Sequence, residues 1–590
     1  MTAKHLAILI GLCLLLTWPV ILHGAPDLSH DGLDHARWAR HFATQFWHGD
    51  LYPRWFTGVN GGYGGPSGFF YPPLTSYASS LFWPLIASHD PYGWLAAGYS
   101  LVLAQILSGI TAYLWLRSIA QPRAALLGAA VYVIAPYHVA IDLYQRGASA
   151  EFWLFAWFPL LLLSAEKLIQ GSRWAIAGLA ASYALAVLSH PTVALCFAPV
   201  LLAYVFFFSE KQQRIRTTVV LVAALLLGVG ITAVYLMPAM LDQHKAYVEW
   251  QTTGHGDYRK EWLVKDGEQL AAMASYAYGV IVRNGTQIEW ELVLQTRILA
   301  VTLVTLFAIA VLFVINRKRE GVPRARTMAV FWLVVPCISL LMMTQLSSPV
   351  WRLVGFLKFL QFPFRFNVML VVSVAALTAL AYQHLLERPV RSLTWLLALT
   401  AVVWLLVDAY SATQVFSAWR EGNPDRVAAN RQFLRTQIDF ATMWPKPGNI
   451  NALSRMSAFD LLVATHPPKS AELPALGGSA QIKSWEPRRV VLEINAAQDS
   501  QLTVNHFYYE GWQGRIDGTS GIVPVRPSAD GLMELDLPKG SYTLTLELPK
   551  DSAEIWGTVI SLLSLAVLAG LALGAWRSGR KQIPAHAVAM

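Results

Sequence analysis

The sequence has little charge and few cysteines, and both shortages restrict what the chain can be. Only 14% of its 590 residues are charged, whereas 55% are hydrophobic. A soluble domain carries about 25% charged residues, so this composition predicts a polytopic membrane protein. The three cysteines, Cys13, Cys196 and Cys337, all lie in apolar runs. The sequence therefore offers neither a disulfide framework nor a cysteine-based metal site.

Several motifs of soluble enzymes are missing as well. The chain has no GxxxxGK[ST], GxGxxG or GxSxG motif, which argues against nucleotide-driven and serine-hydrolase chemistry. It also has no HExxH motif, so a dedicated zinc site is not indicated. The net charge of +9 does not require a nucleic-acid partner, because Lys and Arg collect in the cytoplasmic loops of membrane proteins.

Long apolar runs are what the sequence has in abundance. A span needs about 20 mostly apolar residues, and the runs predict about twelve transmembrane helices. We place these helices at Leu6–Leu22, Trp94–Leu116, Ala124–Val139, Ala150–Leu168, Trp174–Leu188, Thr192–Phe208, Val219–Leu236, Ile298–Ile315, Met328–Met343, Asn367–Leu386, Leu393–Val407 and Ile555–Trp576. The apolar segment Ser76–Ala87 is too short to span and is expected to be interfacial or re-entrant.

The basic residues indicate an orientation. If the N-terminus is cytoplasmic, every short cluster of Lys and Arg between these spans falls on the inner side, as the positive-inside rule requires. The C-terminus is then cytoplasmic too. The outer side receives the long first loop, 24–91, the turns near Tyr144 and His190, and the loop 347–366.

The pattern divides the chain into three parts. Residues 1–410 form a transmembrane domain, residues 411–552 an outer domain, and residues 553–590 the last span with a cytoplasmic tail. In the outer domain a helical lead-in precedes alternating runs that predict a small β-sandwich. These runs are Val490–Ile494, Leu502–Tyr508, Ile522–Val525, Leu532–Leu537 and Tyr542–Leu548.

The first outer loop gathers ionisable residues. A helix through Asp31–Trp47 places Asp31 and His35 on one face, four residues apart. Asp31 or Asp34 could then act as a general base on a hydroxyl. The same spacing also fits a solvated juxtamembrane helix with surface carboxylates, and spacing alone leaves both interpretations open.

Further candidates lie in the other outer turns. Glu151 opens a span, where a carboxylate suits a helix N-terminus, and it could pair with Arg146; alternatively Arg146 lies near a phosphate. His190 is either a structural hydrogen-bonding group or a ligand. Arg365 is either a snorkelling anchor among aromatics or a clamp for a lipid phosphate.

Four motifs together resemble the membrane proteins labelled "6-pyruvoyl-tetrahydropterin synthase-related" and the YfhO-like proteins. They are Asp31-x-x-x-His35, Arg54-Trp55…Gly61-Gly-Tyr63…Tyr71-x-Pro-Leu74, Tyr144-x-Arg146-Gly…Glu151 and Gln361-Phe-Pro-x-Arg365. A fifth element, Tyr508…Gly511-Trp512…Asp517-Gly518, resembles the family's "PGW…DG" hairpin, with Glu510 in place of the expected Pro. Nothing in the chain resembles the soluble, zinc-dependent pterin enzyme.

The resemblance implies a GT-C-type fold and an acidic residue in the first outer loop, which Asp31 matches. It implies a glycosyltransferase that moves a sugar from a polyprenyl-phosphate carrier to an envelope glycan, lipid or protein acceptor, with inversion. The expected catalytic residues are Asp31, Asp34 and His35; the expected substrate-binding residues are Arg54, Arg146, Glu151, His190, Gln361 and Arg365.

No cofactor is required by the sequence, although Asp31, Asp34 and Glu151 leave room for a divalent metal ion. The expected location is the bacterial inner membrane, with the active site on the periplasmic face and membrane lipids as neighbours. Two alternatives stay open: a transporter or flippase for a lipid-linked glycan, and a non-catalytic assembly factor for envelope polysaccharide.

Overall fold

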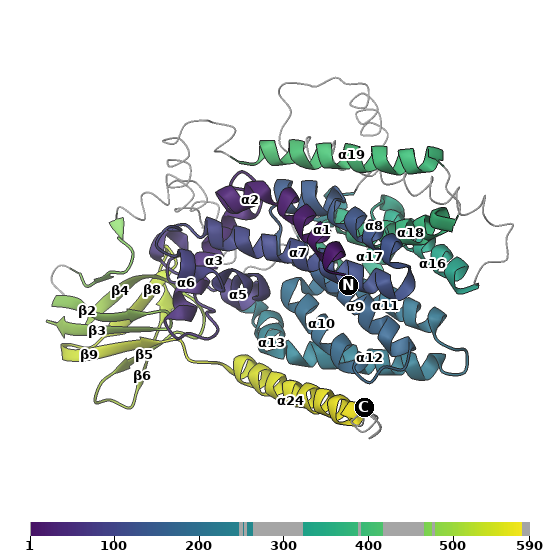
Figure 1. Ribbon diagram of the computed structural model, residues 1–590. Coiled ribbons are helices and arrows are strands. Elements are labelled where there is room, and N and C mark those ends of the chain that lie inside the picture. The colour runs from purple at the N-terminus through teal and green to yellow at the C-terminus, as the bar shows by residue number, and fades with distance from the viewer. Residues whose placement is uncertain are drawn as a thin grey trace, which may run out of the picture.

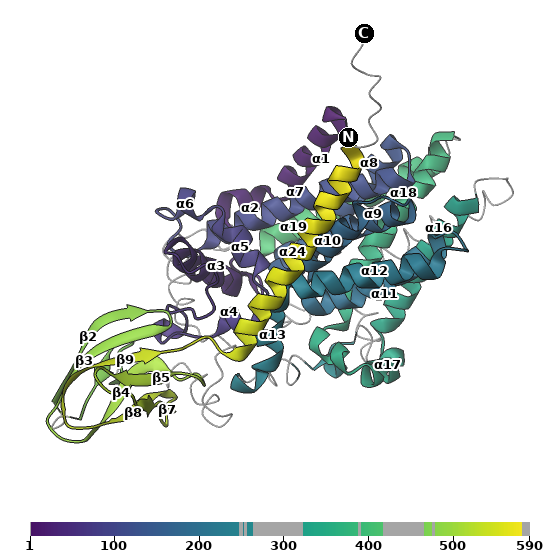
Figure 2. The ribbon, with the colours of Figure 1, turned by 90° about the horizontal axis from the view of Figure 1, so that it is seen from below.

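The computed structural model describes residues 2–246, 252, 257–262, 323–387, 391–416, 465–474 and 478–580. These residues form a helical bundle with a β-domain at one end (Figure 1). The helix α24 (Ser552–Arg580) lies along one side of the bundle and crosses that face diagonally (Figure 2). The N-terminus and the C-terminal end of α24 both lie away from the β-domain (Figure 2).

The helices of the bundle have the length and composition of membrane spans. Among the described residues, seven are long and apolar enough to cross a membrane, or eight if the bent pair Arg326–Met342 and Gln345–Leu353 is one span. The seven are Trp94–Ile119, Pro122–Gln145, Ser149–Ile169, Pro191–Phe208, Arg214–Ile231, Pro363–Gln383 and Ser552–Arg577. A polytopic helical membrane protein is therefore confirmed, while the number twelve stays a prediction. The predicted span Ile298–Ile315 lies outside the described residues.

Two predicted spans are interrupted. The run Leu6–Leu22 forms α1 (Ala3–Leu16) and α2 (Trp18–His23), which meet at Thr17. The run Val219–Leu236 is divided between α12 (Arg214–Ile231) and α13 (Ala233–Leu241). Pro19, two residues after the first break, removes a backbone donor from the ladder.

The remaining helices follow the predicted order. They are α3 (Gly32–Trp47), α4 (Ser67–Phe70), α5 (Leu74–Ser80), α6 (Trp83–Ile86), α7 (Trp94–Ile119), α8 (Pro122–Val133), the π-helix η2 (Tyr137–Gln145), α9 (Ser149–Ile169), α10 (Ala175–Ser189), α11 (Pro191–Phe208), α16 (Pro323–Met342), α17 (Ser348–Leu353), α18 (Asn367–Glu387) and α19 (Arg391–Gln414). The segment Ser76–Ala87 is covered by the short helices α5 and α6, so it does not span.

The β-domain consists of two antiparallel sheets, with strand orders β1-β4-β8-β7 and β2-β3-β9-β5-β6. Its strands are β1 (Ala471–Glu472), β2 (Gly478–Glu486), β3 (Arg489–Ala496), β4 (Ser500–Phe507), β5 (Gln513–Ile516), β6 (Ile522–Pro524), β7 (Arg526–Pro527), β8 (Leu532–Leu537) and β9 (Gly540–Glu547). All five predicted runs are strands. The Tyr508–Gly518 element is not one hairpin, however: β4 and β5 belong to different sheets, and only the turn at Asp517-Gly518 closes a hairpin, between β5 and β6.

The β-domain is tied to the first outer loop by aromatic packing. Trp55 and Phe69 from that loop are buried in the same hydrophobic cluster as the strand residues of the β-domain. Trp55 stacks on His506 with ring centroids 5.0 Å apart, and its Nε1 donates to His506 Nε2 over 3.1 Å. His506 Nε2 must therefore be unprotonated for this contact to form.

A buried carboxylate strengthens the same junction. Glu554, in the first turn of α24, lies 3.0 Å from Arg54 Nε and 2.8 Å from Arg488 Nη2. Arg54 belongs to the first loop and Arg488 to the β-domain, so one carboxylate joins the loop, the β-domain and the last helix. Burial raises the cost of separating such charges.

We expect acid to loosen this junction through His506. Burial lowers the pKa of His506 to about 3, against about 6.5 in an unfolded chain. Between these values the unfolded state binds more protons, so the free energy of unfolding falls as the pH drops from about 6.5 toward 3. Thermal unfolding in detergent at a series of pH values should show a flatter pH dependence for His506→Gln. The exposed control His48→Gln should keep the wild-type slope, and an unchanged slope in His506→Gln would contradict the assignment.

Candidate functional site

Asp31 stands at the start of α3, the helix predicted to carry the chemistry of the first loop. It occupies the N-cap position, but its carboxylate makes no hydrogen bond to the helix backbone, the usual use of an aspartate there. The residue is partly exposed. One turn along, His35 is buried, and this burial lowers its pKa to about 4 although Asp31 acts in the opposite direction. His35 is therefore neutral near pH 7.

Two glycines let the Asp31 turn approach the turn between η2 and α9. A Cβ on Gly147, whose φ is +61°, would lie 2.3 Å from Ser29 Oγ and 2.9 Å from the Gly32 nitrogen. A Cβ on Gly32 would lie 2.3 Å from the Pro26 carbonyl oxygen. With both side chains absent, the Asp31 backbone N–H donates to the Arg146 carbonyl over 2.7 Å.

A cluster of buried charges lies at this turn, and we call Asp142, Arg146, Glu151 and Arg365 the arginine–carboxylate cluster. Arg146 Nη1 donates to Asp142 Oδ1 at 2.5 Å and to Glu151 Oε2 at 2.7 Å. Arg365 Nε lies 3.1 Å from the same Glu151 oxygen. The Tyr137 hydroxyl donates to Glu151 Oε1 at 2.6 Å. Glu151, with 1% of its surface exposed, thus has partners on both oxygens.

Arg365 reaches the cluster from a short 3-10 helix, η10 (Pro363–Phe366). Gln361 precedes it with a φ of +63° and a ψ of −53°, the centre of a γ-turn that reverses the chain after η9 (Gly355–Leu360), with the Phe362 N–H donating to the Leu360 carbonyl over 2.7 Å. Arg365 Nη1 donates to the Leu360 carbonyl at 2.9 Å, and the guanidinium lies 5.2 Å from the Phe362 ring centroid. Gln361 therefore contributes to the backbone turn that positions Arg365.

Two further residues connect the cluster to its surroundings. His190, between α10 and α11, lies within electrostatic range of Arg365, Glu151 and Arg146. Tyr71 lies within range of Asp31, Arg365 and Arg146, and its hydroxyl is 3.2 Å from His35 Nε2. Tyr71 belongs to a family motif, but the sequence does not predict it at the site. It joins the Asp31–His35 pair to the arginine–carboxylate cluster.

Two expected site residues have other partners. Asp34 forms an ion pair with Arg37, three residues further along α3. Its carboxylate is therefore already occupied by a cation. Arg54 is bound at the β-domain junction, to Glu554 and to the Val234 carbonyl at 2.7 Å. The structure thus assembles Asp31, His35, Arg146, Glu151, His190 and Arg365, and it places Arg54 apart from them.

Asp142 and Tyr137 are members of the network that the sequence did not indicate. Both lie in η2, a π-helix, which inserts an extra residue into a helical turn and often occurs at functional sites. The sequence predicts a span that ends at Val139, which leaves Asp142 in the following turn. The one available signal was its spacing, four residues before Arg146.

This geometry neither supports nor contradicts metal binding. Over the part of the chain that the structure describes, no three His, Cys, Asp or Glu side chains lie close enough together to hold a metal ion. The divalent ion considered from the sequence stays a prediction.

Comparison with known proteins assigns the family. The model of the "6-pyruvoyl-tetrahydropterin synthase related domain; membrane protein" matches residues 70–416, more than half of the chain. The chain belongs to this family. The family match contains Tyr71, Arg146, Glu151, His190 and Arg365, whereas Asp31, His35 and Arg54 precede it. No curated protein matches the sequence.

The solved structures similar to this chain include the following three. The oligosaccharyltransferase AglB from Archaeoglobus fulgidus, in complex with an inhibitory peptide and a dolichol-phosphate, is 15% identical over 75% of this chain and 60% of its own, with a TM-score of 0.39. ArnT from Cupriavidus metallidurans, bound to undecaprenyl phosphate, is 13% identical over 83% of this chain and 98% of its own, with a TM-score of 0.32.

The arabinosyltransferase EmbB from Mycobacterium smegmatis is 11% identical over 94% of this chain and 65% of its own, with a TM-score of 0.35. The chain thus spans about 60% of the length of AglB. All three TM-scores are below 0.5, so these similarities do not indicate the chemistry of this chain.

Proposed function

We propose that this protein is a GT-C-type membrane glycosyltransferase that uses a polyprenyl-phosphate-linked sugar. The observation that carries the proposal is the position of Asp31. Its carboxylate makes no hydrogen bond to the backbone of its own helix, and the hydrogen bond from Asp31 N to the Arg146 carbonyl holds the residue beside the buried arginines. A base next to cations is what transfer from a phosphate leaving group needs. The reaction takes place on the periplasmic face of the bacterial inner membrane.

In this reaction the acceptor hydroxyl attacks the anomeric carbon of the donor sugar. The new glycosidic bond forms as the bond from that carbon to the phosphate oxygen breaks, so the lipid phosphate leaves with the bonding electrons. Asp31 accepts the proton of the acceptor hydroxyl. A single displacement inverts the anomeric centre. His35 is a positioning residue: it is neutral, buried and one turn from Asp31.

The phosphate would bind near Arg365. Arg146 is bound to two carboxylates, whereas Arg365 donates one hydrogen bond within the described residues, from Nη1 to the Leu360 carbonyl. Its Nε faces Glu151 at 3.1 Å without forming a hydrogen bond. Arg365 therefore keeps donors for an anion, and a guanidinium suits bidentate contact with phosphate.

Binding of the lipid phosphate tests this proposal without knowledge of the sugar. Purified Arg365→Gln protein in nanodiscs should bind undecaprenyl phosphate at least tenfold more weakly than wild type, because a charge-assisted hydrogen bond is lost. Arg352→Gln is the matched control: Arg352 lies in the preceding helix α17 and is exposed. Equal affinity of wild type and of folded Arg365→Gln protein would count against the phosphate site.

A further inference from the structure

The Tyr71 side chain lies next to the proposed base, on a stiff stretch of backbone. Tyr71 follows α4 and precedes α5, with a φ of −91° and a ψ of 137°. A proline after a residue imposes this extended conformation, and Tyr71 is followed by Pro72 and Pro73. The backbone that carries the Tyr71 ring therefore has little freedom to move.

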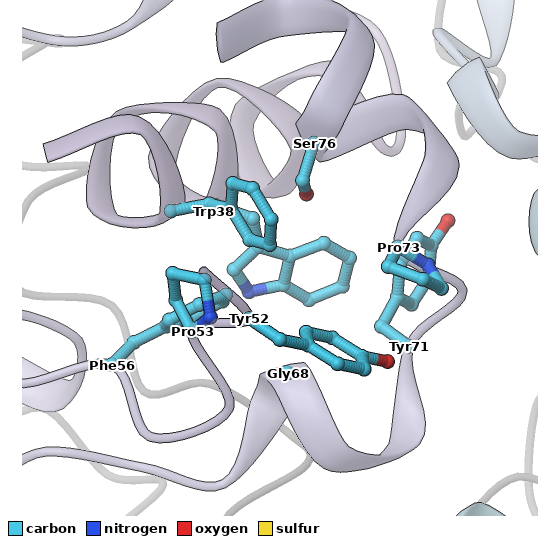
Figure 3. A pocket seen from close by; sticks show the side chains of 9 residues that line it. Trp38, Tyr52, Pro53, Phe56, Gly68, Tyr71, Pro73 and Ser76 are labelled. Carbon is cyan, nitrogen blue, oxygen red and sulfur yellow. The ribbon is translucent and has the colours of Figure 1, made fainter. Parts of the chain in front are cut away.

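The Tyr71 ring is also held by two rings of α3. Its centroid lies 4.2 Å from the Trp38 ring and 5.4 Å from the imidazole of His35. Figure 3 shows Tyr71 at one end of the Trp38 indole, beside Pro73. The cavity that these side chains line with Tyr52 has room for about one water molecule, so the rings are closely packed. This packing places the Tyr71 hydroxyl 3.2 Å from His35 Nε2, within hydrogen-bond distance.

The direction of this hydrogen bond decides which ring nitrogen of His35 carries a hydrogen. Burial, and then the Asp31 carboxylate, raise the pKa of Tyr71, so its hydroxyl keeps its proton. His35 is neutral, because burial lowers its pKa to about 4. The Tyr71 hydroxyl has no other hydrogen bond within the described residues, so it would lack a protein acceptor if Nε2 carried the hydrogen. The hydroxyl therefore donates to Nε2, and the hydrogen of the neutral ring is on Nδ1.

This tautomer separates the roles of His35 and Asp31. A neutral imidazole has one lone pair in the ring plane, and Tyr71 occupies it, so His35 can donate a hydrogen bond but cannot take a proton readily. Without Tyr71, the carboxylate and the imidazole could both act as the base for the attacking hydroxyl. Nδ1 has no hydrogen-bond partner within the part of the chain that the structure describes. The protein itself therefore does not use this donor.

We infer that Tyr71 is a positioning residue of the transfer reaction: by donating to His35 Nε2 it keeps the hydrogen on Nδ1, beside Asp31, as a donor that orients the attacking hydroxyl. One lone pair of the hydroxyl oxygen accepts from Nδ1–H, the other attacks the anomeric carbon, and the proton goes to Asp31. The inference rests on the proposed function and adds a residue to it.

The charged groups around the Tyr71–His35 pair come from three parts of the chain. Asp31 and Asp34 lie at the start of α3, Arg146 follows η2, and Arg365 lies in η10. Asp31 favours protonation of His35, whereas Arg146 opposes it. Because these charges are the same in a Tyr71→Phe variant, that substitution isolates the contribution of the hydroxyl.

Magic-angle-spinning NMR of the full-length protein, labelled with ¹⁵N-histidine in lipid nanodiscs, tests the direction of the bond. Protonated and unprotonated ring nitrogens differ widely in shift, and His35→Gln identifies the His35 signals among those of the 15 histidines. The neutral wild type should show a protonated Nδ1 and an unprotonated Nε2. Tyr71→Phe keeps the ring against Trp38 and should show both tautomers. Its His35 should also titrate at a higher pH, because the bond to unprotonated Nε2 is lost.

Tyr52→Phe is the matched control, because Tyr52 lines the same cavity and its buried hydroxyl has no hydrogen-bond partner within the described chain. It should leave the His35 signals unchanged. Transfer would be followed as release of undecaprenyl phosphate from labelled polyprenyl-phosphate sugars. Tyr71→Phe should lower kcat about three- to tenfold, the effect of losing one neutral hydrogen bond. In a His35→Ala background the same change should have no further effect, since Tyr71 acts through His35.

The tautomer can be measured without transfer, which separates this inference from the proposed function. Asp31→Asn should retain the His35 tautomer while it loses transfer, so the two failures give different results. The inference is overturned if Nε2 carries the hydrogen in the wild type or if Tyr71→Phe leaves the tautomer unchanged. It is also overturned if Tyr71→Phe lowers kcat as much in the His35→Ala background as in the wild type, the result expected of a purely structural tyrosine.

Discussion

Asp31→Asn is expected to reduce sugar transfer by about 10²- to 10⁴-fold, the usual contribution of a positioned general base. Asn keeps the shape of the side chain but cannot accept the proton of the acceptor hydroxyl. The fold should be unaffected, because Asn and Asp are equally favourable at a helix N-cap, and Asp31 makes no side-chain cap in any case. Transfer would be measured as release of undecaprenyl phosphate from labelled polyprenyl-phosphate sugars in membranes that contain the protein.

The matched control for this variant is Asp34→Asn. Asp34 lies on the same helix, three residues away, but it is paired with Arg37. Its replacement should change the transfer rate by less than tenfold. Full activity in Asp31→Asn would eliminate Asp31 as the base, and loss of activity in Asp34→Asn alone would move that role to Asp34.

The general arrangement of the candidate site could be predicted from the sequence. The low charge content indicated membrane spans, and the basic clusters assigned the remaining ionisable residues to one side. Asp31 and His35 four residues apart indicated the helix that the structure shows as α3. Arg146 and Glu151 had a structural and a functional interpretation, and the ion pair between them is present. This pair does not decide between the two, since a phosphate could still bind at Arg365.

The contacts that depend on distant parts of the chain could not be predicted. Arg54 and Arg146 both lie in predicted outer segments and in family motifs, so the sequence does not distinguish them. The partner of Arg54 is Glu554, about five hundred residues away. The strand β2 escaped prediction because its side chains are mostly exposed and do not alternate. Strand β5 contains Gly514, which leaves space for Leu535 and lowers the strand signal.

The way the site is assembled also bears on the alternative functions. A non-catalytic assembly factor would not require Asp31, Arg146 and Arg365 to lie together, yet Tyr71 has all three within electrostatic range.

A transporter needs ionisable groups along a path through the membrane. In another carboxylate–arginine pair, Glu166 is buried, Arg324 is half exposed, and Glu166 also accepts the Tyr204 hydroxyl. Both Glu166 oxygens thus have partners, an arrangement typical of a structural clamp between helices.

Glu151→Gln should cause the largest loss of stability of any change at the site, about 3–5 kcal/mol, the typical cost of removing one partner of a buried ion pair. Glu151 is the carboxylate that Arg146 and Arg365 share, and all three side chains are less than one-tenth exposed. Gln can still accept the Tyr137 hydroxyl, but it cannot balance two guanidinium groups. Thermal unfolding of the protein in nanodiscs should therefore show a large drop in midpoint.

Glu166→Gln is the informative comparison, because Glu166 is equally buried and also accepts a tyrosine hydroxyl. Its cation, Arg324, has 48% of its side chain exposed, so water can solvate the charge that the substitution leaves behind. Its loss of stability should be clearly smaller than that of Glu151→Gln. Adding Arg365→Gln to Glu151→Gln should then recover part of the stability, because one of the two uncompensated cations is removed. If the two single glutamate variants are equally stable, burial alone sets the cost, and the two arginines on Glu151 do not interact with it as strongly as their distances indicate.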